Sequence, residues 1–212
     1  MTTLDYIAQK YSLDLGVPQM PIEIPNAGRG DLAILFKELG FVTGAEIGTE
    51  RGAYAKLLCK ANPSLRLYCI DSWMTYDGYN EHIGQEIWDG FYDTARQRLA
   101  PYNCELVRKF SMDAVKDFAP NSLDFVYIDA NHEFRYMVDD LHEWSKRVRK
   151  GGVVAGHDFC RPRGRRDHTN VIEAVTGFTS SYRVWPWFVL GTKAVVAGQK
   201  RDSSRSYFWV KD

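Results

Sequence analysis

Short apolar runs alternate along the chain with longer segments whose apolar residues recur at helical spacing. The apolar runs predict strands at residues 45–48, 65–71, 104–110, 123–129 and 152–158. Helical patterns cover residues 32–39, 54–61, 85–99, 112–118 and 134–148, and Asp31 is the expected N-cap of the first. Strands that alternate with helices predict an α/β fold, with a doubly wound, mostly parallel sheet covered on both faces.

The two ends of the chain depart from this alternation. Residues 1–30 are punctuated by prolines and predict an N-terminal arm with one short helix. Beyond residue 158, one last helix is expected at 171–178, followed by aromatic-rich β segments at 182–190, 193–198 and 206–211. No change of composition marks a linker, so we expect residues 31–212 to form a single domain.

Charge and cysteine content exclude several classes of partner. The chain has 27 basic and 27 acidic residues, so no net charge draws it to nucleic acid or to an anionic membrane. No apolar run is long enough to span a membrane, and the first residues lack the apolar core of a secretory signal. Cys59, Cys69, Cys104 and Cys160 show no CxxC spacing. We therefore expect a cytoplasmic protein with reduced cysteines.

Glycines and carboxylates follow the first two predicted strands, at the edge where parallel sheets bind ligands. The first strand leads into Glu46-Ile-Gly-Thr-Glu-Arg-Gly52, and the second ends at Asp71, which is placed to accept hydrogen bonds from both hydroxyls of a ribose. The loop lacks the third glycine of the dinucleotide fingerprint, and Glu46 and Glu50 would repel a pyrophosphate. These carboxylates suit a nucleoside with a cationic tail, as in S-adenosylmethionine.

Several segments resemble class I S-adenosylmethionine-dependent methyltransferases: EIGTERG, CID, FSMDAV, LDFVYIDANHEF and KGGVVAGHDF. They are most similar to the small branch grouped with macrocin O-methyltransferase and cephalosporin-hydroxylase-like proteins. The resemblance covers roughly residues 29–212. It implies a Rossmann-like, seven-stranded sheet that ends in an antiparallel C-terminal hairpin, with S-adenosylmethionine as the cofactor.

The resemblance also implies the cofactor contacts. Glu46 and the two glycines of the loop would border the methionine part, Asp71 would bind the ribose, and the segment after the third strand would flank the adenine. The full set of expected contacts is Glu46, Gly48, Thr49, Gly52, Asp71, Ser72, Trp73, Ser111, Met112 and Asp129.

The chemistry is expected after the fourth and fifth strands, at Asp129, His132, His157 and Asp158. Methyl transfer requires an aligned acceptor and removal of its proton. In catechol-type O-methyltransferases, groups at these strand ends hold Mg²⁺, and a basic residue three positions after the first Asp takes the hydroxyl proton. The resemblance thus implies His132 as the base and Asp129, His157 and Asp158 as ligands of Mg²⁺ or a transition metal, which imidazole suits better. His157 is also open as a base or hydrogen-bond donor.

The acceptor is expected to be a hydroxyl of a small molecule or sugar. The run Arg161–Arg166 follows directly and fits either an anionic acceptor or a solvated loop. Two other functions stay open. One is a nicotinamide-dependent Rossmann oxidoreductase, which a two-glycine loop with Glu50 fits poorly, and the other is a catalytically silent nucleoside-binding module.

Overall fold

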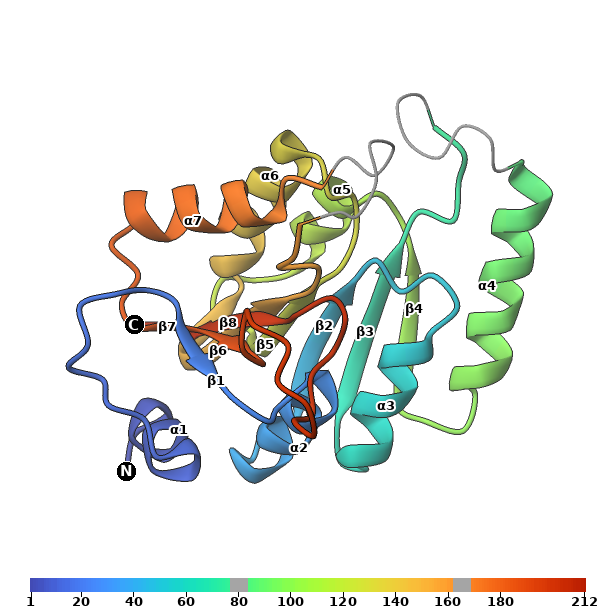
Figure 1. Cartoon of the computed structure of the whole chain (residues 1–212). Helices are drawn as coiled ribbons and strands as arrows, with labels where there is room; N and C mark the ends of the chain where they lie inside the picture. Colours follow the sequence, from blue (N-terminus) through green and yellow to red (C-terminus); the bar gives the residue numbers. More distant parts are fainter. Residues whose placement is uncertain (77–83, 162–168) are drawn as a thin grey trace.

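The computed structural model describes residues 1–76, 84–161 and 169–212. Their strands form one eight-stranded sheet in the order β1-β7-β8-β6-β5-β2-β3-β4 (Figure 1). The strands are β1 (Ile22–Ile24), β2 (Thr43–Ile47), β3 (Arg66–Asp71), β4 (Cys104–Arg108), β5 (Leu123–Ile128), β6 (Val148–Gly156), β7 (Trp187–Leu190) and β8 (Tyr207–Val210). β8 runs antiparallel to β6 and β7, and the other neighbouring pairs are parallel. The mostly parallel sheet with its antiparallel C-terminal strands is confirmed.

Residues from the N-terminal arm add a strand to the seven that were expected. β1 pairs in parallel with β7, with Ile22 opposite Phe188. The arm also holds α1 (Thr3–Tyr11), which begins with a capping box between Thr2 and Asp5. α1 is fastened to the sheet because the Thr3 hydroxyl donates a hydrogen bond to the carbonyl of Gly151, at 2.6 Å. The expected boundary at residue 30 falls inside α2 (Arg29–Glu38).

Helices cover both faces of the sheet (Figure 1). α2, α3 (Ala53–Ala61) and α4 (Gln85–Leu99) contact one another in sequence, and α5 (Ser111–Ala114), α6 (Phe134–Ser145) and α7 (Val171–Ser181) form a second contacting group. A 3-10 turn, η1 (Val115–Asp117), continues α5. The central strand β5 explains the two layers: Phe125 and Tyr127 join the core with α2 and α3, whereas Val126 and Ile128 join the core with α6 and α7. Successive side chains of a strand point to opposite faces, so both faces of β5 are buried.

Two details differ from the sequence prediction. α2 begins at Arg29, with Gly28 as N-cap, and Asp31 lies in its first turn, where the Asp31 carboxylate accepts a hydrogen bond from the Gly28 amide at 2.8 Å. The expected β segment at residues 193–198 forms bends and turns instead. Val195 is 78% exposed, so this apolar run has no face to bury and gains nothing from a sheet.

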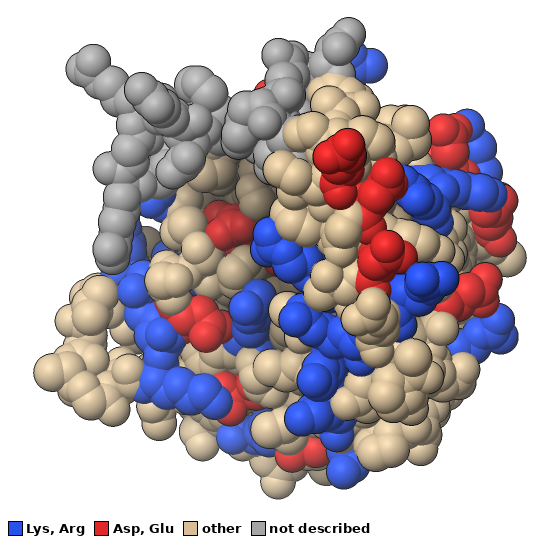
Figure 2. Space-filling model, turned by 90° about the vertical axis from the view of Figure 1, so that its right-hand side faces the viewer, with Lys and Arg blue, Asp and Glu red and all other residues tan. Residues whose placement is uncertain are grey.

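The face that presents α4 and β4 mixes acidic and basic side chains (Figure 2). Exposed ion pairs join Arg66 to Glu105 at 3.1 Å and Arg96 to Asp93 at 3.2 Å. Such exposed pairs each contribute little to stability, about 0–1 kcal/mol. Within the three described stretches, none of the helices has the length and apolar character needed to cross a bilayer.

Candidate active site

A cleft of about 660 Å³ opens beyond the carboxyl ends of β2, β3, β4 and β5. β2 pairs with β3 on one side and with β5 on the other, so the order of the strands reverses at β2. Ligands usually bind at such a reversal in open α/β sheets. Most of the residues expected from the sequence line it: Glu46, Gly48, Thr49, Asp71, Ser72, Ser111, Met112, Asp129 and His132. Gly52, Trp73, His157 and Asp158 are not among its lining residues.

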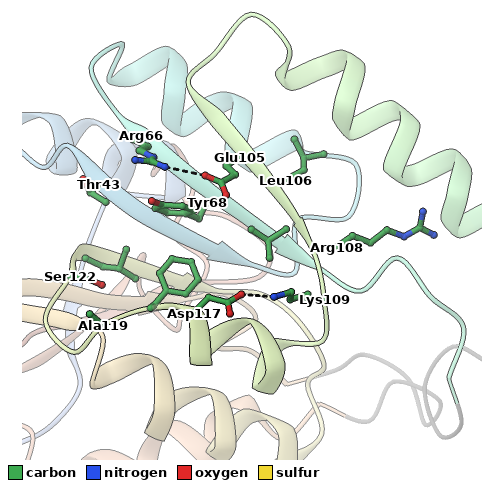
Figure 3. A pocket seen from close by; sticks show the side chains of 13 residues that line it. Thr43, Arg66, Tyr68, Glu105, Leu106, Arg108, Lys109, Asp117, Ala119 and Ser122 are labelled. Carbon is green, nitrogen blue, oxygen red and sulfur yellow. Dashed lines mark hydrogen bonds and ion pairs between the residues drawn. The ribbon is translucent and has the colours of Figure 1, made fainter.

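A second hollow, of about 590 Å³, lies beside β3, β4 and η1 (Figure 3). Its polar side chains are largely paired with one another: Arg66 contacts Glu105, and Lys109 contacts Asp117 at 2.6 Å. The described lining contains none of the expected catalytic residues. The cleft at the strand ends is therefore the candidate site.

The two glycines of the loop are required by the protein's own backbone. Gly48 has a φ of 89°, and a Cβ there would lie 2.0 Å from the carbonyl oxygen of Asp129. Gly52, the N-cap of α3, has a φ of 70°, and its Cβ would lie 2.9 Å from a methyl of Leu99. Gly48 therefore lets the loop cross tightly over the end of β5 in the cleft floor, and Gly52 lets α3 begin close against α4.

Glu46 places a buried carboxylate in this floor. It is 2% exposed, and its Oε2 has no hydrogen-bond partner among the described residues. Burial raises the pKa of Glu46 well above its usual value. The neighbouring Thr49 opposes the rise, and the charges of Asp129 and Asp71 add to it. A buried, unpaired carboxylate is costly, so this position is suited to a cationic ligand.

Asp71 holds the loop as well as facing the cleft. Its Oδ1 accepts a hydrogen bond from the Trp73 amide and its Oδ2 one from the Glu50 amide, both at 2.9 Å. Burial raises the pKa of Asp71, and these two backbone donors oppose the rise. A carboxylate offers about four acceptor positions, so Asp71 retains capacity for two ligand hydroxyls.

Trp73 supports the loop from behind. Its ring is fully buried, packs edge-on against Tyr92, and its Nε1 donates to the Glu50 carbonyl at 2.7 Å. The expected contact between Trp73 and the cofactor is therefore not seen in the geometry of the cleft. The indole serves to fix the backbone that carries Glu50.

Four polar side chains meet where β5 and β6 end. The Nε2 of His132 lies 3.4 Å from Oδ1 of Asp129 and 3.2 Å from Oδ2 of Asp158. The Nδ1 of His157 lies 3.6 Å from Oδ2 of each carboxylate. His132 lines the cleft, whereas His157 is set further back, with 12% of its side chain exposed.

The pKa values of His132 and Asp158 in this cluster are both shifted toward the charged forms of these groups. Burial acts to lower the pKa of His132, but contact with Asp129 and the negative charges of Asp158 and Asp129 raise it. Burial acts to raise the pKa of Asp158, yet the two histidines and Ser204 bring it well below its usual value. The cluster therefore raises the proton affinity of the His132 imidazole.

The potential metal ligands differ from the expected set. Asp129, His132 and Asp158 each offer one ligand atom, and these atoms lie within 4.8 Å of one another. His132 thus occupies the position that was expected for His157, because its Nε2 lies between the two carboxylates. Two carboxylates and an imidazole are a donor set that suits a divalent transition metal.

The sequence prediction missed Asp140, which lines the cleft from α6. Asp140 is 3% exposed and lies on the same helical face as Met137, Leu141 and Trp144, which are all buried. An acid on the apolar stripe of an amphipathic helix was the available signal. Of the run Arg161–Arg166, only Arg161 is described, and it forms an ion pair with Glu173 of α7. The rest of the run lies outside the described residues.

Comparison with known proteins assigns the chain to a family. A family described as a methyltransferase domain matches residues 45–159, more than half of the chain. An uncharacterized protein of Acanthamoeba polyphaga mimivirus is 25% identical over 122 residues, which cover 56% of this chain and 52% of that protein. The chain thus spans about half the length of this curated relative.

Two solved structures share the fold. An O-methyltransferase from Bacillus cereus, in complex with S-adenosylhomocysteine, has a TM-score of 0.59 and 17% identity, with 99% of this chain and 90% of that chain covered. TomG from Streptomyces achromogenes, an O-methyltransferase of tomaymycin synthesis in complex with S-adenosylmethionine, has a TM-score of 0.59, 19% identity and the same coverage. The oxidoreductase alternative is not favoured. The family match covers the glycine loop and the strands from β2 to β6, which form the central part of the sheet. The chain therefore belongs to the methyltransferase domain family.

Proposed function

We propose that the cleft binds S-adenosylmethionine and that the protein transfers its methyl group to a hydroxyl of a small-molecule acceptor. The observation that carries the proposal is the unpartnered Oε2 of Glu46 in the cleft floor, close to Asp71. The ammonium of the methionine part supplies the cation that Glu46 lacks. Asp71 then accepts from the ribose, and Ser111 and Met112 at the end of β4 border the base. The two relatives of the same fold that hold this cofactor or its product support this assignment.

The protein's own contribution to the reaction is positioning and proton transfer. The sulfonium of the cofactor supplies an activated methyl group, so no further activation of the leaving group is needed. His132 lines the cleft and is the group placed to take the proton of the acceptor hydroxyl. Asp129 and Asp158 stabilise the imidazolium that this transfer produces. His157 contacts the same two carboxylates from behind and holds them in place.

A divalent metal on Asp129, His132 and Asp158 would exclude this role of His132, because the metal would occupy the same Nε2. Chelation distinguishes the two arrangements. Full activity in excess chelator supports His132 as the base. Loss of activity that Mn²⁺ or Co²⁺ restores at least as well as Mg²⁺ supports the metal, since imidazole is a better ligand for transition metals.

Calorimetric titration with S-adenosylhomocysteine tests the proposed binding. Wild-type protein is expected to bind, and Asp71→Ala to bind about 10- to 150-fold more weakly, because hydrogen bonds to a charged acceptor contribute about 1.5–3 kcal/mol. Asp93→Ala is the matched control, since Asp93 is an exposed α4 residue outside the cleft lining. Wild-type protein that does not bind, or Asp71→Ala that binds as tightly as wild type, contradicts the proposal.

A further inference from the structure

Ser111 lies in a buried hydrogen-bond network at one end of the cleft. Its hydroxyl donates to Oδ1 of Asp140 and accepts from the indole Nε1 of Trp144, at 2.8 Å. Asp140 is 3% exposed and Trp144 is fully buried. Both partners come from α6, whereas Ser111 opens α5, so the network joins two helices of the same layer. Ser111 and Asp140 both line the cleft.

The chemistry of the two partners fixes the direction of these hydrogen bonds. An indole N–H can only donate, and an ionised carboxylate can only accept. A serine hydroxyl has one hydrogen and two lone pairs, so the hydrogen is used by Asp140 and one lone pair by Trp144. What Ser111 can still offer to a ligand is a single acceptor lone pair.

The order of groups along the strand ends places the base of a bound nucleoside at this network. Glu46 follows β2, Asp71 ends β3 and Ser111 follows β4, and these three strands are neighbours in the sheet. A ligand whose cationic end meets Glu46 and whose ribose meets Asp71 extends its base toward Ser111. Ile70 and Met112 line the cleft there and supply apolar surface for a planar ring.

We propose that Ser111, oriented by Asp140 and Trp144, selects a nucleoside whose base carries an amino donor at position 6, as adenine does, over one that carries a carbonyl oxygen there. A 6-oxo purine would place a carbonyl oxygen against the remaining lone pair of Ser111, so two acceptors would face each other without a hydrogen. This inference rests on the proposed function and names Asp140 as the residue that positions Ser111. Asp140 would thus control which base binds through its hydrogen bond with Ser111, without contacting the ligand itself.

The protonation state of Asp140 adds a second readout. Burial raises the pKa of Asp140 to about 7, with the charge of Asp139 adding to the rise and the hydrogen bond from Ser111 opposing it. Tyr207 of β8, among the described residues, also interacts electrostatically with Asp140, and its own pKa lies well above the usual value because it is buried. Protonated Asp140 can donate to Ser111, which then has its hydrogen free. Selectivity for the amino group is therefore expected to be strongest above about pH 7.

Calorimetry with two probes tests the inference: S-adenosylhomocysteine and S-inosylhomocysteine, which carries a 6-oxo group. At about pH 8, wild-type protein is expected to prefer the adenosyl probe by about 10- to 100-fold, the cost of a mismatched buried acceptor. Asp140→Leu frees the Ser111 hydrogen and is expected to lower this ratio to near unity. Glu143→Leu replaces another acid of α6, which is outside the cleft lining and the network, and it is expected to keep the wild-type ratio.

Ser111→Ala provides a second test if the Asp140→Leu variant does not fold. It removes the hydroxyl itself, and we expect it to weaken the binding of S-adenosylhomocysteine while leaving the affinity for S-inosylhomocysteine unchanged. The inference is overturned if wild-type protein binds both probes equally, or if Asp140→Leu or Ser111→Ala keeps the full preference. Absence of any binding of S-adenosylhomocysteine to wild type would instead contradict the proposed function, so the two failures are distinguishable.

Discussion

Glu46→Gln is expected to make the free protein more stable and the cofactor complex weaker. Gln has nearly the shape of Glu, so the packing of the loop is preserved while the charge is removed. Glu46 is 2% exposed and its Oε2 has no partner in the described structure. In the free protein this carboxylate is a cost, whereas in the complex it meets the ammonium of the ligand. The same substitution should therefore change stability and affinity in opposite directions.

The magnitudes follow from the two environments. An unsatisfied buried polar group costs about 1–3 kcal/mol, more when it is charged, so Glu46→Gln is expected to raise the free energy of unfolding by roughly this amount near pH 8. The folded-state pKa of Glu46 lies above its usual value of 4.5. The unfolded chain therefore releases the proton first as pH rises, and wild-type stability falls relative to the variant from about pH 5 upward. Loss of a charged hydrogen bond weakens ligand binding by about 10- to 150-fold.

Urea unfolding at about pH 5 and pH 8, with and without S-adenosylhomocysteine, measures both effects. Glu105→Gln, an exposed position on β4, is the matched control and should change stability by less than about 0.5 kcal/mol. The reasoning is refuted if Glu46→Gln binds the ligand as tightly as wild type. It is also refuted if the stability difference between variant and wild type is the same at both pH values.

Three further outcomes are expected. Gly48→Ala should destabilise the fold by more than about 1–3 kcal/mol in thermal unfolding, since its Cβ would lie 2.0 Å from the Asp129 carbonyl, whereas Gly90→Ala, with open space around it in α4, should stabilise it by about 0.5–1 kcal/mol. His132→Ala should lower methyl transfer to a hydroxyl acceptor by about 10²–10⁴ in a product assay while S-adenosylhomocysteine still binds, and equal rates would remove His132 from the chemistry. Affinity for S-adenosylhomocysteine should rise between about pH 6 and pH 8 as Asp140, with its pKa of about 7, loses its proton, and Asp140→Leu should abolish this part of the pH dependence.

The apolar runs predicted the central strands because burial on both faces leaves a clear pattern. LDFVYI forms β5 as expected, with both faces in a core. The same reasoning failed at residues 193–198, where a short apolar run is exposed, because a pattern within one segment does not reveal whether a partner surface is available. β1 was missed for the converse reason: three residues between prolines form a strand only because β7 offers an edge to pair with.

The residues of the candidate site that lie at the ends of strands could be predicted from their positions in the sequence. Residues at or shortly beyond the ends of strands, such as Asp71 and His132, do line the cleft. Two features depend on contacts between distant segments and left weaker signals. Trp73 was expected to contact the ligand but is buried behind the loop, and Asp140, which the sequence analysis did not single out, is buried against Ser111.

A crystal structure of the protein with S-adenosylhomocysteine is the most direct test of the proposed cofactor site. The account predicts density in the cleft with the amino group of the ligand on Glu46, the ribose hydroxyls on Asp71 and the adenine amine within hydrogen-bond distance of Ser111 Oγ. Density for the ligand at another place, or in this cleft with the base and the amino acid exchanged, would contradict it.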